Sequence, residues 1–162
     1  MKKVFLSLVA VLLCGVTFAQ TEITQENFVS AIKANTSGEF ILTENINLGD
    51  LGEIDEAIIP SFSGTLDGNN YTISYQANFL GDTYNGNYGL FGSVNGIIED
   101  LKVNAKVTFS GTQDNMQVGL LCGLVNNNGT IKLCNVSGNI NSTVQAGNGG
   151  GTDAGLVAGQ CL

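Results

Sequence analysis

The sequence predicts an all-β chain that coils into a stacked parallel β-solenoid, similar to a β-helix, with one short capping helix near its N-terminus. Three observations lead to this prediction. Short apolar runs alternate with Gly, Asn, Ser and Thr along most of the 162 residues, and only one proline occurs. A Gly-Leu-x-x-Gly box recurs, and a single segment has convincing helical spacing. Short strands separated by dense turn signals are typical of all-β folds.

The first 19 residues are predicted to be a secretory signal peptide. Lys2 and Lys3 form a positive start, and an apolar run with one serine follows. Thr17-Phe18-Ala19 then places small residues at both positions of a cleavage site, so we expect cleavage after Ala19. The apolar run is shorter than the roughly 20 residues that cross a membrane. We therefore expect a secreted or cell-surface protein with no membrane span.

Residues 20–38 are predicted to form an N-terminal capping segment. Thr24 has the chemistry of a helix cap, and Phe28, Val29 and Ile32 follow at helical spacing. Polar residues and a glycine at 35–38 then end the helix. An isolated amphipathic helix at the start of a β chain is expected to act as a lid over one end of the fold.

Residues 39–162 are predicted to be solenoid repeats because they resemble one another at intervals of 30 to 36 residues. The box "GLLCG" at 119–123 aligns with "GLVAG" at 155–159, and "GLFG" at 89–92 is a version one residue shorter. A second box, Ile-x-x-Leu-x-Val at 98–103, matches Ile-x-x-Cys-x-Val at 131–136. Asn-Gly turns separate the boxes, and "DGNN" at 67–70 marks an earlier turn.

Such a repeat is too short to bury its own apolar face. Stacking the copies places like residues above like residues, and each backbone pairs with the next copy at about 4.8 Å. The apolar positions of the boxes then fill the interior, and the Asn and Gly positions form the corners.

The boxes also resemble a known family. "GLLCGLVNNNGTIKLCNVSG", "GLFGSVNGIIEDLKV" and "AGLVAGQ" are similar to the GLUG-motif repeats of secreted and surface-attached bacterial proteins, and "FSGTLDGNNYTIS" resembles the segment that often precedes them. The resemblance covers roughly residues 60–162. It implies a β-solenoid module of large envelope proteins, including adhesin-like chains and a region of some immunoglobulin-cleaving proteases, and it carries no catalytic residues.

This chain differs from the family in being short and in stopping inside a third copy, at Gln160-Cys161-Leu162. We therefore expect the repeats to be truncated at the C-terminus. An open solenoid end has exposed strand edges, so we expect either further chain or self-association there.

Composition excludes several partners and reactions. Residues 20–162 hold four lysines, no arginine and all 14 acidic residues, which gives a net charge of −10. An acidic chain without arginine lacks the cationic surface that nucleic acid requires. With no histidine, triads of the Ser-His-Asp and Cys-His kinds are impossible. We expect no enzyme activity and no cofactor.

Residues 20–162 contain two types of side chain that could bind metal ions. Cys122, Cys134 and Cys161 remain after cleavage, but without histidine or a Cys-x-x-Cys motif they do not predict a zinc site. An odd number of thiols leaves the disulfide state open. The acidic stretch at 53–56 and the turn at 67–70 have calcium-type oxygen ligands without a known calcium-loop pattern. We expect no metal site.

The alternative function is a carbohydrate-active β-helix enzyme, or a fragment of one. It would need two carboxyl groups about 5 to 9.5 Å apart. The candidates by residue type are Asp67, Asp82, Glu99, Asp100 and Asp114.

The favoured function is an adhesin-like binding or scaffolding module of the bacterial surface. Tyr75, Tyr84 and Tyr88 lie in an aromatic-rich segment with many Asn and Gly residues. Exposed tyrosines stack on sugars and anchor protein contacts. These three residues are the predicted binding surface, and a glycan or a host or matrix protein is the expected partner.

Overall fold

The structure, a computed structural model, describes residues 20–81, 86–111, 116–143 and 152–162. Within these residues the chain forms one helix, α1 (Phe28–Ala34), and strands β1 to β16. The strands gather into four sheets, A to D, and the strands in each sheet are parallel. The all-β fold with stacked parallel sheets is thus confirmed.

Sheets A and B contain the strands that begin each coil of the chain. Sheet A has the order β1-β2-β5-β9-β13, with the bounds Thr21–Ile23, Glu39–Leu42, Thr65–Asp67, Ile97–Glu99 and Thr130–Lys132. Sheet B has the order β3-β6-β10-β14, with the bounds Ile46–Ile54, Thr72–Gly81, Lys102–Gly111 and Asn135–Ser142.

Sheets C and D contain the strands that complete each coil. Sheet D has the order β7-β11-β15, with the bounds Asn87–Tyr88, Met116–Gly119 and Thr152–Gly155. Sheet C has the order β4-β8-β12-β16, with the bounds Ile59–Phe62, Phe91–Val94, Cys122–Val125 and Ala158–Cys161.

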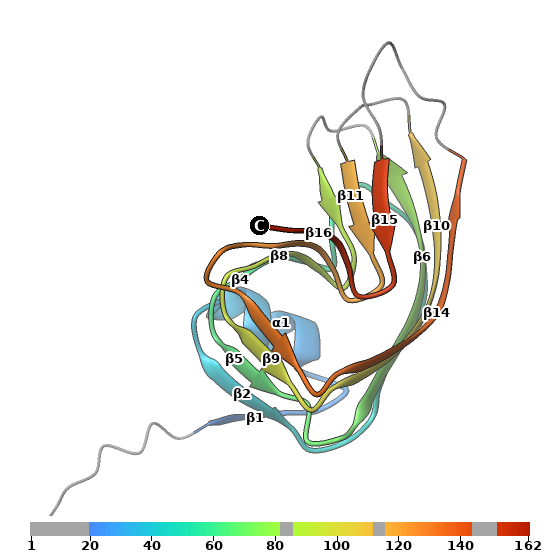
Figure 1. Ribbon diagram of the computed structural model, residues 1–162. Coiled ribbons are helices and arrows are strands. Elements are labelled where there is room, and N and C mark those ends of the chain that lie inside the picture. The colour runs from blue at the N-terminus through green and yellow to red at the C-terminus, as the bar shows by residue number, and fades with distance from the viewer. Residues whose placement is uncertain (1–19, 82–85, 112–115, 144–151) are drawn as a thin grey trace, which may run out of the picture.

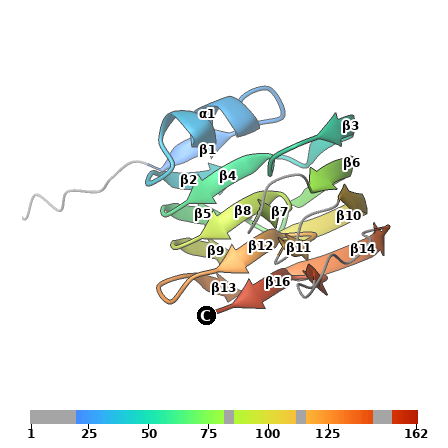
Figure 2. The same ribbon diagram turned by 90° about the horizontal axis from the view of Figure 1, so that it is seen from above.

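Each full coil adds one strand to each of the four sheets. The third coil is β5 to β8, the fourth is β9 to β12 and the last is β13 to β16. Figure 1 looks along the stack, so the coils superimpose, whereas Figure 2 shows them as layers running from α1 to β16. Since each coil contacts its neighbours, strands about 30 residues apart in sequence lie side by side.

The register of the strands matches the spacing of the boxes. Ile131 pairs with Ile98, and Val136 pairs with Val103. Gly155 pairs with Gly119 in the same way. Like residues therefore lie above like residues, as the repeat analysis predicts.

The box positions require glycine because a larger side chain would overlap neighbouring backbone atoms. A Cβ at Gly119 would overlap the carbonyl oxygen of Cys122, because the chain folds back sharply from β11 to β12. A Cβ at Gly123 would lie 2.6 Å from the backbone nitrogen of Tyr88, because β12 passes against β7. The box thus forms a corner at which sheets C and D touch through their backbones.

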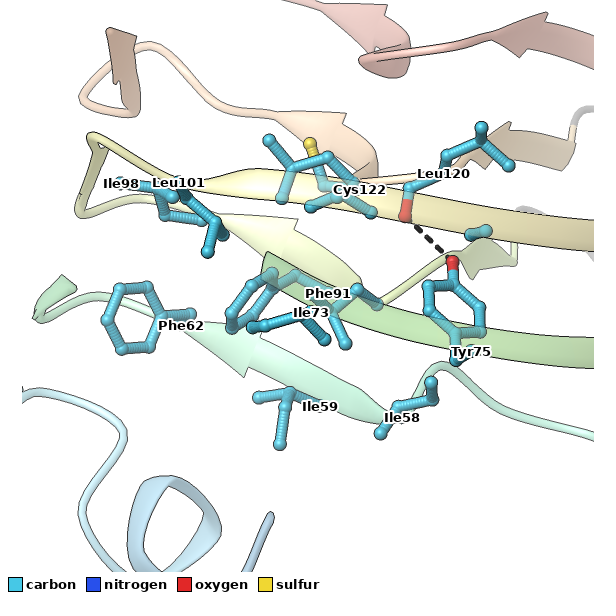
Figure 3. Close-up of a cluster of buried hydrophobic side chains, with 14 of the residues drawn as sticks. Ile58, Ile59, Phe62, Ile73, Tyr75, Phe91, Ile98, Leu101, Leu120 and Cys122 are labelled. Atoms are coloured by element: carbon cyan, nitrogen blue, oxygen red, sulfur yellow. Dashed lines mark hydrogen bonds between the residues drawn. The ribbon is translucent and has the colours of Figure 1, made fainter. Parts of the chain in front are cut away.

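Aromatic rings pack against one another at tilted angles in the interior between the sheets. The ring centroids of Phe40 and Phe62 are 6.2 Å apart, and those of Phe62 and Phe91 are 5.3 Å apart. All three side chains are buried. Figure 3 shows Phe62 and Phe91 among the aliphatic side chains that complete this cluster.

Helix α1 lies at the N-terminal end of the stack (Figure 2) and buries Phe28 and Ile32 in the core. The predicted cap, however, was wrong by three residues. The helix is preceded by Asn27, whose side-chain oxygen accepts a hydrogen bond from the Thr24 N–H at 2.8 Å. Residues 25–27 form a turn instead of a first helical turn, so Thr24 lies too early to cap α1.

Strand β3 is the irregular edge of sheet B. Its pairing with β6 shifts register twice, between Asn47 and Asp50 and between Asp50 and Glu53. Gly49 and Gly52 adopt φ values of 70° and 65° at these shifts. The side chains of Asn47 and Asp50 accept hydrogen bonds from the N–H groups of these glycines, each at 3.0 Å. Bulges of this kind break the regular edge that another strand would need for pairing.

Within the described part of the chain, no helix has the length and apolar character needed to span a membrane.

Candidate interaction surfaces

Tyr75, a predicted binding residue, points into the core. Its side chain is 3% exposed, and its hydroxyl donates a hydrogen bond to the carbonyl oxygen of Leu120 at 2.7 Å (Figure 3). Burial raises the pKa of this phenol well above its ordinary value. Tyr75 thus ties β6 to the box of the next coil and is not accessible to a ligand.

Tyr88 is also buried, with 2% of its side chain exposed. Its ring packs between Phe79 and Phe109, at centroid distances of 5.7 and 5.1 Å. Tyr84 lies outside the described residues. The prediction of an exposed tyrosine surface is therefore corrected for Tyr75 and Tyr88, because alternation along β6 and tight packing of β7 direct both rings inward.

The outward residues of sheet B form a polar surface that the sequence analysis missed. Ser74 pairs with Asn104 across β6 and β10, and Gln76 pairs with Lys106. Polar residues of β3 and β14 extend both rows. The alternation of apolar and polar residues in 72–79 and 102–109 was the signal that could have located this face.

Between these rows lies a groove of about 410 Å³, which we call the outer-face groove. Tyr75 and Ala105 line it, but because their side chains face the core, they contribute backbone to its floor. A second hollow of about 310 Å³ adjoins it and shares three of its residues. The side chains along the walls of the two are Asn47, Asp50, Glu53, Ser74, Gln76, Asn78, Asn104, Lys106, Thr108 and Asn139.

The chemistry of the outer-face groove is that of hydrogen bonding. Amides and hydroxyls both donate and accept, the carboxylates of Asp50 and Glu53 accept, and Lys106 donates. Lys106 is exposed, and it forms no ion pair with any other described residue. The groove crosses all four strands of sheet B and therefore runs along the stack.

The carboxylates of the enzymatic alternative have structural roles where they are described. Asp67 accepts a hydrogen bond from the backbone N–H of Asn69 at 2.7 Å. Glu99 forms an ion pair with Lys132 at 2.6 Å, and the interaction raises the pKa of that lysine. Asp100 occupies a corner with φ of 50°. Asp82 and Asp114 lie outside the described residues, and none of the three described carboxylates lines the outer-face groove.

The second surface is the end of the stack formed by the last coil, which we call the open end. The four most exposed large hydrophobic residues of the described chain all lie there: Leu133 is 78% exposed, Leu162 64%, Leu156 49% and Val157 43%. Two of them, Leu133 and Val157, line an apolar hollow of about 500 Å³ together with Val125, Ile131, Cys134, Ala158 and Cys161. Strands β13 to β16 each have a described neighbour on one side only.

The solvent exposure of the three thiols increases from the interior toward the open end. Within the described residues Cys122, Cys134 and Cys161 are all unpaired, with Cys122 buried and Cys161 exposed. Burial raises the pKa of Cys122 to about 12, and it also raises the pKa of Cys134. Among the described Asp, Glu and Cys side chains, no three gather as a metal ion would require.

Comparison with known proteins found no match to a family model, to a curated protein or to a solved structure.

Proposed function

We propose that the chain is a non-catalytic, adhesin-like binding module of a bacterial protein that is secreted or held at the cell surface. The observation that carries this proposal is the outer-face groove, a continuous polar surface on a stiff stack of strands. The GLUG-like boxes and the predicted signal peptide support the same assignment. The open end supports a second contact, with another protein chain.

The ligand class proposed for the groove is a hydroxyl-rich glycan. Its walls hold many paired donors and acceptors and only one cationic side chain, so they suit hydroxyl groups better than a polyanion. Because the described walls lack an exposed aromatic ring, binding to one sugar is expected to be weak. Repetition of similar polar residues along the stack would allow an extended glycan to be held by many weak contacts.

The test is binding and turnover of residues 20–162, which contain every described element, on an array of glycans and matrix proteins. We expect binding without turnover to one class of extended glycan. Gln76→Ala combined with Lys106→Ala should reduce that binding at least about tenfold, because both exposed side chains line the groove. Glu39→Ala, at an exposed position on sheet A, is the matched control and should bind normally.

Each other outcome has a definite meaning. Turnover that is lost on an Asp→Asn exchange would overturn the non-catalytic proposal in favour of the carbohydrate-active alternative. Binding to a matrix protein that is unaffected by the double substitution would place adhesion elsewhere on the molecule. If the protein binds nothing on the array and turns nothing over, the proposed glycan and matrix-protein partners are rejected.

A further inference from the structure

Exposed apolar side chains and unpaired strand edges of the described chain gather at the open end. A comparison of the boxes in the last two coils shows which contacts are lacking there. In the fourth coil Leu120 and Leu121 are fully buried, and the next coil covers them through hydrogen bonds from Leu120 and Cys122. Their counterparts Leu156 and Val157 stack in the same way but are about half exposed, because no described coil lies over them. A partner at the open end would therefore need an apolar surface to cover Leu156 and Val157, and strand edges to pair with the last coil.

Charge is distributed unequally along the stack. Residues 20–56 contain eight acidic residues and one lysine, for a net charge of −7, whereas residues 116–162 contain only Lys132 and Asp153, for a net charge of zero. Lys132 is already paired with Glu99. Two open ends can thus approach each other without repulsion, while the acidic ends stay far apart.

The other end of the stack does not offer a matching surface. Helix α1 covers it, and its β3 edge is broken by two register shifts and carries Asp50 and Glu53. Stacking head to tail would place the apolar open end against this covered, acidic end. The open end has its best counterpart in another open end.

We propose that the open end binds a second copy of this chain across a twofold axis, which makes a closed dimer with the two α1 helices at its outer ends. Leu133, Leu156 and Val157 of each copy supply the apolar contact. With the twofold axis perpendicular to the plane of sheet B, the β14 strands of the two copies meet antiparallel. Among the edge strands of the last coil, β14 (Asn135–Ser142) is the longest, and it pairs with β10 without a register shift and carries no charge.

This pairing rests on the proposed association at the open end but not on glycan binding, because the exposed hydrophobic residues are absent from the outer-face groove. The two proposals can therefore fail separately. The glycan array decides the adhesive function, and the mass of the purified chain in solution decides the pairing.

The experiment is sedimentation equilibrium of residues 20–162 over a range of concentrations. We expect a monomer–dimer equilibrium without larger species. Leu156→Glu should weaken the dimer at least about tenfold, because the substitution occurs twice in a twofold contact. Leu133→Glu, on the most exposed of these residues, is a second variant on another part of the end. Ser61→Glu, at an exposed position of β4 in sheet C, is the control and should leave the dimer unchanged.

A distance measurement tests the orientation. Spin labels on the exposed Cys161 in a Cys134→Ser background should be close together in the dimer. Labels on Glu22→Cys, in a Cys134→Ser and Cys161→Ser background, should be far apart. A monomer at every concentration, an open-ended polymer, a dimer insensitive to both Leu→Glu variants, or close labels at position 22 would each overturn the pairing. Circular dichroism of the variants confirms that they remain folded.

Discussion

The two ends of this stack solve the problem of an exposed sheet edge to very different extents. At the N-terminal end, α1 lies over the stack and inserts Phe28 and Ile32, and β3 is bulged and acidic. At the open end, β14 pairs with β10 over eight residues without a register shift, and its outer edge has no covering element among the described residues. The comparison shows that edge protection is not inherent in a parallel stack and must be added to it.

The distribution of charge also distinguishes the protected end from the open end. Most of the acidic residues belong to the covered end, and the open end is neutral and apolar. One end therefore resists association by three independent means, whereas the other has none of them. Substitutions that act on one end and spare the other can test this difference.

The largest effect is expected from a side chain added to the box glycine of a covered coil. Gly119→Val should lower the free energy of unfolding by about 3 kcal/mol or more, since its Cβ would overlap the Cys122 carbonyl inside the stack. Gly155→Val makes the equivalent overlap with Ala158 in the last coil, where the outer side is open. Its cost should be nearer 1 kcal/mol. Urea denaturation of both variants measures the two values, and equal costs would contradict the contrast.

Removing the lid should be the next largest change. Phe28→Ala deletes a buried ring from α1 and should cost about 3 kcal/mol. It should also let the covered end begin to associate, which would appear as species larger than a dimer in sedimentation. Ser30→Ala, at an exposed position of the same helix, removes only the hydrogen bond from the hydroxyl to the Asn27 carbonyl, and it should cost less than about 1 kcal/mol. A loss of stability without new association would show that the acidic β3 edge protects this end by itself.

Backbone strain at the bulged edge should give a smaller effect. Gly49→Ala and Gly52→Ala place a side chain at φ values of 70° and 65°, where each should cost about 1 kcal/mol. Neither Cβ would meet a neighbouring atom, so the cost comes from the backbone alone. Thermal unfolding of each variant measures it. Unchanged stability would mean that these positions readily adopt a regular strand conformation.

The smallest effect at neutral pH comes from the thiols. The folded pKa of Cys122 is raised to about 12, so its contribution to stability is complete below the unfolded pKa of about 8.5 and is lost as the pH rises toward 12. Stability should therefore fall above about pH 8.5, and Tyr75 should add to the fall above about pH 10. Cys122→Ala should flatten the first part of the curve, while Cys161→Ser, at the exposed open end, should leave it unchanged.

Structural features that follow from a repeated pattern could be predicted from the sequence, whereas features that depend on one local contact could not. The spacing of Ile98 and Ile131 predicted their pairing because a stacked coil conserves register. Alternation places Tyr75 with Ile73 and Ala77 on the inner face and predicts its burial, whereas its aromatic, Asn-rich context predicts exposure; the alternation is what the fold follows. The bulges of β3 could not be predicted, because they depend on local bonds from Asn47 and Asp50 that resemble ordinary turn chemistry.

The candidate surfaces show the same limit. A solenoid end was expected to be open, and the structure describes an apolar hollow there. The outer-face groove was missed because its residues are dispersed through the sequence at intervals of about 30 and gather only when the coils stack. To predict which side chains of different coils lie side by side, the register of every strand must be known, and one sequence motif does not give that register.

The like-above-like register has a consequence for how such a chain can change in evolution. An in-frame duplication of one box-containing repeat would insert a complete layer, because each of the last three coils presents equivalent box glycines and apolar positions to its neighbours. Each inserted layer would lengthen the molecule by about 4.8 Å without redesign of the layers around it. The length of the stack could thus be adjusted through the number of repeats encoded in one gene, one layer at a time.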